Sequence, residues 1–398
     1  MIYLKKMIPL LVCLLFALSL FAGCIGQGTD TTTKSTSDTR TIVDMAGKTV
    51  TIPKNIERVA IFGGPIGQVP HILGVEDKLC AVSKGHQRSE LLATMDPRIM
   101  TLPAPRSTNG VINIEELLFS NPQFVIAGDV DAEIVEKNTK IPVVQFMATS
   151  DGNYAQTKAE VTFLGEVFER PEKAKKYCDY LDNTIKFLNE RLADLPEDER
   201  LVVFNGFDSS HLVTYGTGSY MEERIESAGC LNAASDVSTQ GKKEGIHSGL
   251  DQISMEQLIA WNPDIIIIDF GTPEDLYNDP RWAKISAIKN KKVYRLPSAV
   301  FIWNRPSAES AVLHPIWLAK IAHPDRFKDV DIKTEIKKFY KEIFEYELSE
   351  EQVDKILSGE YASTVGGLSG GYTGGQQQGG GQGNQKGAGK EGNQTKQN

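Results

Sequence analysis

Apolar residues along this chain fall into short runs of strand length that alternate with segments of helical period. Strands that alternate with helices indicate mostly parallel sheets with helices packed on them. The strand-like runs lie at 58–62, 79–83, 124–128 and 142–147, and again at 200–207, 264–271 and 291–297. Ahead of the first run, residues 41–53 alternate on both sides of Gly47, which predicts a β-hairpin.

Residues 153–196 separate the two series and contain no strand candidate. Pro171 suits the first position of a helix. The apolar stripe that follows has spacings of 4, 3, 4, 3 and 4 residues and consists of Ala174, Cys178, Leu181, Ile185, Leu188 and Leu192. Such a helix of six turns is about 30 Å long.

The fold class that follows is α/β, with two lobes of mostly parallel sheets joined by one long rigid α-helix. We expect the N-terminal lobe at 41–152, the linking helical segment at 153–196, and the C-terminal lobe with its terminal helices at 197–360.

Both ends of the chain differ in composition from this region. Residues 1–24 combine Lys5 and Lys6 with an apolar run and end at Ala22-Gly23-Cys24, which resembles a lipoprotein signal. The resemblance implies a lipid on Cys24 and a place on the outer face of the cytoplasmic membrane; an uncleaved membrane anchor is the alternative. Residues 25–40 are expected to be a flexible polar spacer, and 361–398 a disordered Gly/Gln-rich tail.

The net charge and the cysteines of the chain argue against some classes of function. The net charge of −9 argues against nucleic acid as a partner. Cys80, Cys178 and Cys230 form neither a disulfide framework nor a CxxC zinc motif, so we expect them to be small buried residues.

One helix-then-strand unit occurs twice, as "NIEELLFSNPQFVIAG" and "SMEQLIAWNPDIIIIDFG". Aligning Pro122 with Pro263 places Glu115 on Glu256, a shift of 263 − 122 = 141 residues. Asn113 and Ser254 are good N-caps, and Glu116 and Gln257 are expected to complete capping boxes. The two twin glutamates could favour the helix dipole by about 0.3–1 kcal/mol, or they could point outward and contact a partner.

The ordered set of segments resembles the helix-linked substrate-binding proteins of ABC importers, whose ligands are iron–siderophores, haem and vitamin B12. The similarity covers 41–327 and includes "RVAIF-GGP", both twin units, "YGTGSYMEERIESAG" and "WNRPSAES". It implies that Glu115 and Glu256 dock on arginines of a dimeric permease, which works with an ATPase. A monomer that captures a metal chelate, most favourably a ferric siderophore and alternatively haem or a corrinoid, is the function implied.

Ligands of open α/β sheets bind beyond the carboxyl ends of the strands. We therefore predict a cleft lined by loops of both lobes: Gly63, Gly64, Pro65, Arg106, Ser107 and Asp129 from the first, and Tyr215, Phe270, Trp303 and Arg305 from the second. The glycines permit close backbone approach or form a simple turn. Trp303 could stack on a planar ligand or pack between lobes. Arg106 and Arg305 could pair with ligand anions, or be structural charges.

Other classes of function have less support from the residues. Direct Zn²⁺ or Mn²⁺ binding would need several His in the cleft, and only His86, His211 and His247 lie in suitable loops. "YGTGSY" lacks the spacing of a phosphate loop, and neither HExxH nor GxSxG occurs. We expect a binding protein, not an enzyme, with no catalytic residues, no cofactor and no directly bound metal.

Overall fold

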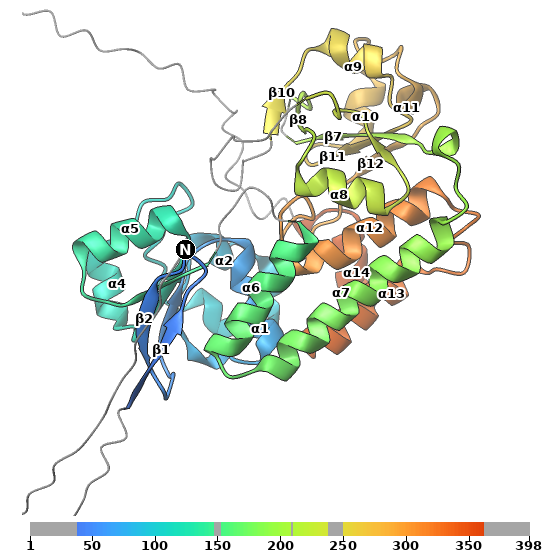
Figure 1. Ribbon diagram of the computed structural model, residues 1–398. Coiled ribbons are helices and arrows are strands. Elements are labelled where there is room, and N and C mark those ends of the chain that lie inside the picture. Colours follow the sequence, from blue (N-terminus) through green and yellow to red (C-terminus); the bar gives the residue numbers. More distant parts are fainter. Residues whose placement is uncertain (1–37, 147–152, 208–209, 238–249, 362–398) are drawn as a thin grey trace, which may run out of the picture. The chain divides into compact units, whose positions relative to one another are not determined.

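The computed structural model describes residues 38–146, 153–207, 210–237 and 250–361 (Figure 1). The predicted signal peptide with Cys24, residues 25–37 of the spacer, residues 362–398 of the tail and His247 lie outside the described residues. Within the described part, no helix is long and apolar enough to cross a membrane.

The predicted hairpin is confirmed. β1 (Thr39–Val43) pairs antiparallel with β2 (Thr49–Pro53), and Gly47 turns the chain between them at φ 80°. The Asp44 carboxylate accepts hydrogen bonds from the amides of Ala46 and Lys48 in the same turn. The hairpin starts at Thr39, so the last residues of the expected spacer already belong to the fold.

A parallel sheet of four short strands forms the first lobe. Its order is β4-β3-β5-β6, and nearly every strand position is buried. The strands are β3 (Val59–Ile61), β4 (Leu79–Ala81), β5 (Phe124–Ala127) and β6 (Val143–Gln145). The helices are η1 (Pro65–Gln68), α1 (Val69–Leu73), η2 (Glu76–Lys78), α2 (Lys84–Gln87), α3 (Glu90–Met95), η3 (Pro97–Met100), α4 (Ile114–Ser120) and α5 (Asp129–Asn138).

Two helices occupy the linking segment, α6 (Tyr154–Val167) and α7 (Pro171–Leu192). At 22 residues, α7 is about 33 Å long. It contacts α1 of the first lobe and α12 of the second (Figure 1). Its buried face contains Tyr177 and Thr184, while the predicted Cys178 and Ile185 lie at the edge. Tyr177 belongs to the buried face because its hydroxyl donates to the Ala308 carbonyl at 2.9 Å.

The second lobe repeats the topology of the first. Its parallel sheet has the order β12-β11-β7-β9, so in both sheets the first strand in sequence lies between the second and the third. The strands are β7 (Val202–Gly206), β9 (Leu231–Asn232), β11 (Ile265–Ile268) and β12 (Val293–Arg295). An unpredicted antiparallel pair, β8 (Val213–Tyr215) with β10 (Leu250–Gln252), lies beside this sheet.

The helices of this lobe include one that is buried on nearly all sides, α12 (Ala308–Ala322), which contacts α6, α7, α8 and η1. A helix that is apolar all round is typical of a core position. The others are η4 (Glu197–Glu199), α8 (Tyr220–Ser227), α9 (Met255–Trp261), α10 (Pro273–Tyr277), α11 (Ser286–Lys289), α13 (Ile332–Phe339), the π-helix η6 (Tyr340–Phe344) and α14 (Glu350–Leu357). Tyr361, assigned from the sequence to the tail, is buried against this core.

The twin units fold alike. Asn113 caps α4 by accepting from the Glu116 amide, and Ser254 caps α9 by accepting from the Gln257 amide. The expected capping boxes are wrong, because the Glu116 carboxylate accepts from the Ala104 amide instead, and no reciprocal bond from Gln257 is found among the described residues.

Candidate ligand-binding site

The loops at the carboxyl ends of the strands meet where the first lobe contacts the second. Phe301 of the second lobe lies against Gly64, where an added Cβ would be 3.8 Å from the phenyl ring, and against the His86 ring at 6.1 Å. Close by, the side-chain amide of Gln68 donates to the Glu309 carboxylate at 3.2 Å. The structure thus brings predicted cleft loops of both lobes together.

The glycine pair shapes the first of these loops. Gly63 has φ 109°, and a Cβ there would lie 2.9 Å from the Phe146 ring, so only glycine fits without strain. The Gly64 carbonyl accepts a hydrogen bond from His86 Nε2 at 2.9 Å. Gly63 therefore serves a tight turn, and Gly64 and Pro65 remain partly exposed beside it.

His86 is a structural residue in this arrangement. Its Nε2 donates to Gly64, and its Nδ1 accepts from the Ser83 amide at 3.3 Å. Burial lowers the pKa of His86 to about 4, so the ring is neutral at physiological pH. Among the residues that the structure describes, no cluster of three His, Cys, Asp or Glu side chains could hold a metal ion.

The arginine of the first lobe, Arg106, is already paired. Its guanidinium donates to the carboxylate of Asp131, which is buried. Ser107 is committed to its own loop, where its hydroxyl accepts from the Val111 amide at 3.0 Å. Asp129 is the exposed first residue of α5. A ligand contact by these three residues stays a prediction.

Two predicted ligand contacts of the second lobe are packed in the interior. Trp303 is fully buried and donates through Nε1 to Glu309 at 2.7 Å. Tyr215 is buried as well, and its hydroxyl donates to the Asn304 carbonyl at 3.0 Å. Both expectations are corrected by this burial, since neither ring offers a face to a ligand. Phe270 is partly exposed, and the Arg295 guanidinium lies over its ring.

Arg305 differs from Arg106 in having no acidic partner. Its side chain is 8% exposed and lies over the Phe207 ring at 5.2 Å. Among the described residues it forms no ion pair, and its Nη1 has no hydrogen-bond partner. Buried polar groups are normally satisfied, so an unpaired guanidinium at the end of a cleft loop is a candidate for binding an anion.

Asp269, the residue after β11, offsets the positive charge of Arg305 only in part. Its buried carboxyl accepts hydrogen bonds from the side-chain amide of Asn205, at 3.1 Å, and from the side-chain amide of Asn304. Burial raises the pKa of Asp269 to about 7, although Arg305 lies near enough to oppose the rise. The carboxyl is therefore about half protonated at pH 7 and largely protonated well below it. Sequence reasoning missed Asp269, although a polar residue directly after four isoleucines was a usable signal.

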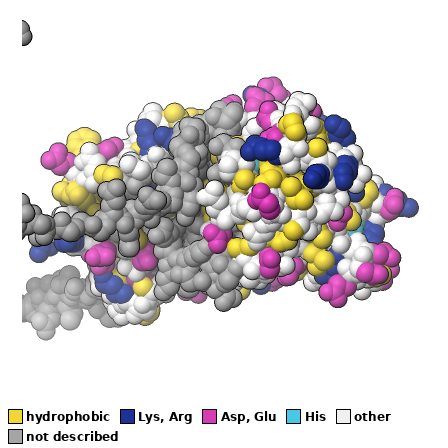
Figure 2. All heavy atoms as spheres, turned by 90° about the horizontal axis from the view of Figure 1, so that it is seen from above, with side chains coloured by type: hydrophobic (Ala, Val, Ile, Leu, Met, Phe, Trp, Pro, Cys, Tyr) yellow, Lys and Arg dark blue, Asp and Glu magenta, His cyan; other side chains and the backbone are white. Residues whose placement is uncertain are grey.

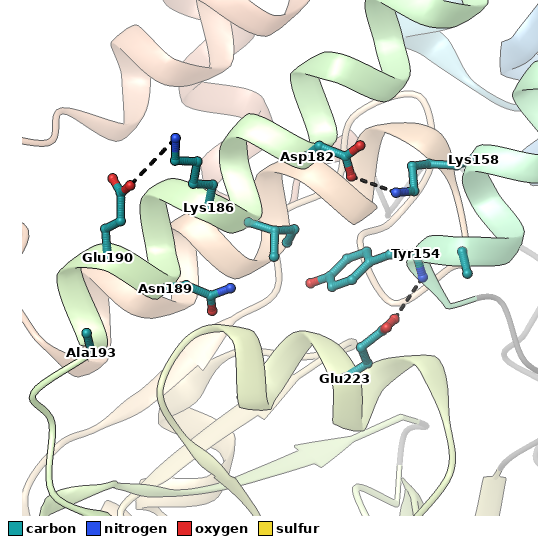
Figure 3. A pocket seen from close by; sticks show the side chains of 10 residues that line it. Tyr154, Lys158, Asp182, Lys186, Asn189, Glu190, Ala193 and Glu223 are labelled. Atoms are coloured by element: carbon teal, nitrogen blue, oxygen red, sulfur yellow. Dashed lines mark hydrogen bonds and ion pairs between the residues drawn. The ribbon is translucent and has the colours of Figure 1, made fainter.

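A separate groove of about 660 Å³ lies between α6, α7 and α8 (Figure 3). Lys158 pairs with Asp182 at 2.6 Å and Lys186 with Glu190 at 3.8 Å, and the Glu223 carboxylate accepts from the backbone amide of Tyr154 at 2.8 Å. The groove lies on the linking helices and away from the strand ends, so we do not assign the ligand to it.

Charges of both signs are interspersed on the molecular face drawn in Figure 2. Apolar side chains lie among them on that face. This mixture is unlike the basic stripe that a nucleic-acid-binding surface presents.

Two parallel-sheet lobes, a linking helix and loops that converge from both lobes define a helix-linked substrate-binding protein of an ABC importer. A family model described as "Periplasmic binding protein" matches residues 59–300, which is more than half of the chain, and the chain belongs to that family. Such proteins are extracytoplasmic and work with an ABC permease and its ATPase.

Individual relatives differ in their ligands. The chain is 27% identical over 330 residues to the molybdate-binding protein MolA of Haemophilus influenzae, covering 77% of this chain and 91% of that one. The molybdate-bound MolA structure has a TM-score of 0.65 at 25% identity and covers 78% of this chain and 99% of that one. A periplasmic solute-binding protein of Veillonella parvula gives 0.70 at 25% identity, with coverage of 82% and 99%. The haem-uptake protein IsdE of Staphylococcus aureus is 28% identical over 35% of this chain and 48% of its own length.

Proposed function

We propose that the protein captures a compact oxyanion of the molybdate type and delivers it to an ABC permease, with no catalytic step. The observation that carries the proposal is the buried guanidinium of Arg305, which has no acidic partner among the described residues. Taking a cation out of water is unfavourable unless an anion or several hydrogen-bond acceptors replace the water. A bound oxyanion would supply the negative charge and the hydrogen-bond acceptors together.

The relative MolA supports the chemical class, because it matches nearly its whole length and its printed function is molybdate binding. The expected ferric siderophore, with haem or a corrinoid as alternatives, had come from the family resemblance and had been supported by stacking of Trp303 and by two free arginines. Trp303 is buried and Arg106 is paired with Asp131. We therefore keep these chelates as the alternative ligands that the experiment below must distinguish from an oxyanion. Lipid attachment at Cys24 and a location on the outer face of the membrane remain part of the proposal, supported by the residues of the signal-like segment. A monomeric state is proposed as well and rests on the family resemblance alone.

Isothermal titration of the full chain, purified without chelators, tests this proposal with molybdate, sulfate, a ferric siderophore and haem. We expect molybdate to bind and Arg305→Ala to weaken binding by about 1.5–3 kcal/mol, the value of a charge-assisted hydrogen bond. Arg106→Ala is the matched control and should have a smaller effect, because Asp131 already neutralises Arg106.

Two results would overturn the proposal. Molybdate affinity that is unchanged in Arg305→Ala would remove this residue from the site. Absence of molybdate binding, together with a coloured complex of the siderophore or haem, would assign the protein to the chelate class.

A further inference from the structure

The residues Trp303–Arg305, which lie two residues before the start of α12 at Ala308, are called the arginine loop below. We propose that Tyr215, Tyr220 and Arg224 are positioning residues that hold this loop so that the Arg305 guanidinium is presented in one orientation to the ligand. The inference rests on the proposed function, since it assigns to Arg305 the contact with the anion. Tyr215 ends β8, and Tyr220 and Arg224 lie one turn apart on α8.

The backbone carbonyls of the arginine loop are all bound by these side chains. The Asn304 carbonyl lies 3.0 Å from the Tyr215 hydroxyl and 2.6 Å from the Tyr220 hydroxyl. Arg224 Nη1 donates to the carbonyl of Trp303 at 3.2 Å and to that of Arg305 at 3.0 Å. Three consecutive carbonyls are thus held by donors from one distant part of the chain.

The side chains of the loop are fixed as well, except one. Trp303 donates to Glu309, and the Asn304 amide donates to Asp269. The Arg305 guanidinium has neither an ion pair nor a partner for Nη1 among the described residues. The Asn304 side-chain oxygen also lacks a hydrogen-bond partner within the described part of the chain, but an oxygen can only accept, so the Arg305 guanidinium is the donor that remains for an anionic ligand.

Arg224 supports this interpretation by its own environment. It is 1% exposed, its guanidinium lies 5.0 Å from the Tyr220 ring, and within the described part of the chain it forms no ion pair. Burial lowers the pKa of Arg224, which shows how unfavourable this place is for a cation. Arg224 Nη2, like Arg305 Nη1, has no hydrogen-bond partner among the described residues. Arg224 differs from Arg305 in that its Nη1 already donates to two loop carbonyls, and we therefore assign it the positioning role.

The expected physical effect is preorganisation of the site. A loop whose carbonyls are all bound loses little conformational freedom when the anion arrives, so binding is tighter. Removing a donor leaves a buried carbonyl short of a partner and lets the loop adopt other conformations. Binding of the ligand must then also order the guanidinium, and the free energy that this ordering requires lowers the affinity.

The test uses Tyr220→Phe, which removes one hydroxyl and keeps the ring. Molybdate affinity, measured by titration, should fall about 3- to 10-fold, as expected for one lost hydrogen bond to a buried carbonyl. Tyr177→Phe is the matched control, because its buried hydroxyl also donates to a carbonyl, that of Ala308, at 2.9 Å, outside the arginine loop. It should leave the affinity within about 2-fold of wild type.

A double-mutant cycle separates positioning from general stability. In an Arg305→Gln background, Tyr220→Phe should no longer change the residual affinity, because the group it positions is gone. Equal losses in both backgrounds would overturn the inference. Arg224→Lys should restore part of the affinity that Arg224→Met loses, since lysine can still donate to a carbonyl.

A ligand-free measurement distinguishes failure of this inference from failure of the proposed function. Nitrogen-15 NMR of the arginine Nε–H groups reports the order of Arg305 without any anion. Tyr220→Phe should broaden or shift the Arg305 signal, whereas Tyr177→Phe should leave it unchanged. If the signal responds but molybdate does not bind, the loop mechanism holds and the proposed ligand is wrong. If the signal does not respond, the inference is wrong whatever the ligand.

Discussion

Single residues join the two lobes at the buried carboxyl group of Glu309. Its Oε1 accepts from Trp303 at 2.7 Å, and its Oε2 accepts from the side chain of Gln68 of the first lobe at 3.2 Å. In return, the Gln68 side-chain oxygen accepts from the Glu309 backbone amide at 3.3 Å. Both Gln68 and Glu309 are fully buried. Gln68 ends the turn that follows Gly63 and Gly64. The hydrogen bonds between Gln68 and Glu309 therefore connect a cleft loop of the first lobe to one of the second.

The same carboxyl should make stability depend on pH. Burial raises the pKa of Glu309 from 4.5 to about 7, so between these values the folded protein holds a proton that the unfolded chain has released. Stability should therefore be greatest below about pH 4.5 and fall as the pH rises to about 7, by about 3 kcal/mol for this group. Glu309→Gln should remove this part of the slope and be more stable than wild type at pH 8.

Urea unfolding across that pH range would measure the effect. The pKa of Asp269 is raised in the same direction, to about 7, so a slope due to Asp269 should remain in the variant. Glu115→Gln, at an exposed position, is the control and should leave the slope as in wild type. A Glu309→Gln protein with the full wild-type slope would show that this carboxyl keeps its charge when buried.

Candidate site residues were predictable when the chemistry lay in the loop itself. Arg305 could be proposed from the sequence because it is a cationic residue in a loop expected at the cleft, and its contact with a ligand stays a prediction. Trp303 was misplaced because its burial depends on Glu309 and on the packing of α12, neither of which shows in the local pattern. Tyr220 and Arg224 were missed as positioning residues because their acceptors lie about 80 residues later in the chain.

Elements of the two lobes can be compared directly, because the twin units end in the same way. Asn121 after α4 and Asn262 after α9 both adopt the left-handed conformation at φ 46°. Their side chains differ in environment. The Asn262 side-chain oxygen accepts from the amide of Ser286, at 2.9 Å, and from its hydroxyl, whereas among the described residues no hydrogen bond of the Asn121 side chain is found.

Replacing each of these asparagines by glycine should therefore have different effects. Glycine adopts positive φ easily, and the backbone contribution is the same at both positions, so it cancels in the difference. Asn262→Gly should be less stable than Asn121→Gly by about 1 kcal/mol, the value of the lost hydrogen bonds. Chemical unfolding of both variants measures this, and equal stabilities would mean that the Ser286 contacts contribute nothing.

Most strands of the two main sheets were visible in the sequence because they are buried on both faces and lie in apolar runs. β8, β9 and β10 were not, because their sequences, Val-Thr-Tyr, Leu-Asn and Leu-Asp-Gln, mix polar with apolar residues. β8 and β10 pair across a separation of 35 residues, from Tyr215 to Leu250. Such pairing depends on tertiary contacts that no local pattern reveals.

The whole molecule is organised as two lobes of equal strand order, and the twin glutamates occupy equivalent places in them. Glu115 and Glu256 are exposed second residues of α4 and α9. Their caps, Asn113 and Ser254, already satisfy the third helical amide. Since neither glutamate is needed for its cap, we expect both to serve a partner, and a dimeric permease offers two equivalent places.

Charge reversal tests this expectation on the intact transport system. Glu115→Lys/Glu256→Lys should retain ligand affinity, while uptake by cells that carry the permease and ATPase falls strongly, because like charges would face each other across the contact. The neutral Gln pair should show a smaller loss. As helix-start residues alone, the two glutamates would change stability by no more than about 1 kcal/mol per site and leave uptake nearly normal. Glu133→Lys, at an exposed position of α5, is the control for charge reversal elsewhere on the first lobe. Reversal of matching arginines on the permease should restore uptake, and normal uptake by a stably folded double Lys variant would leave both glutamates as ordinary helix-start residues.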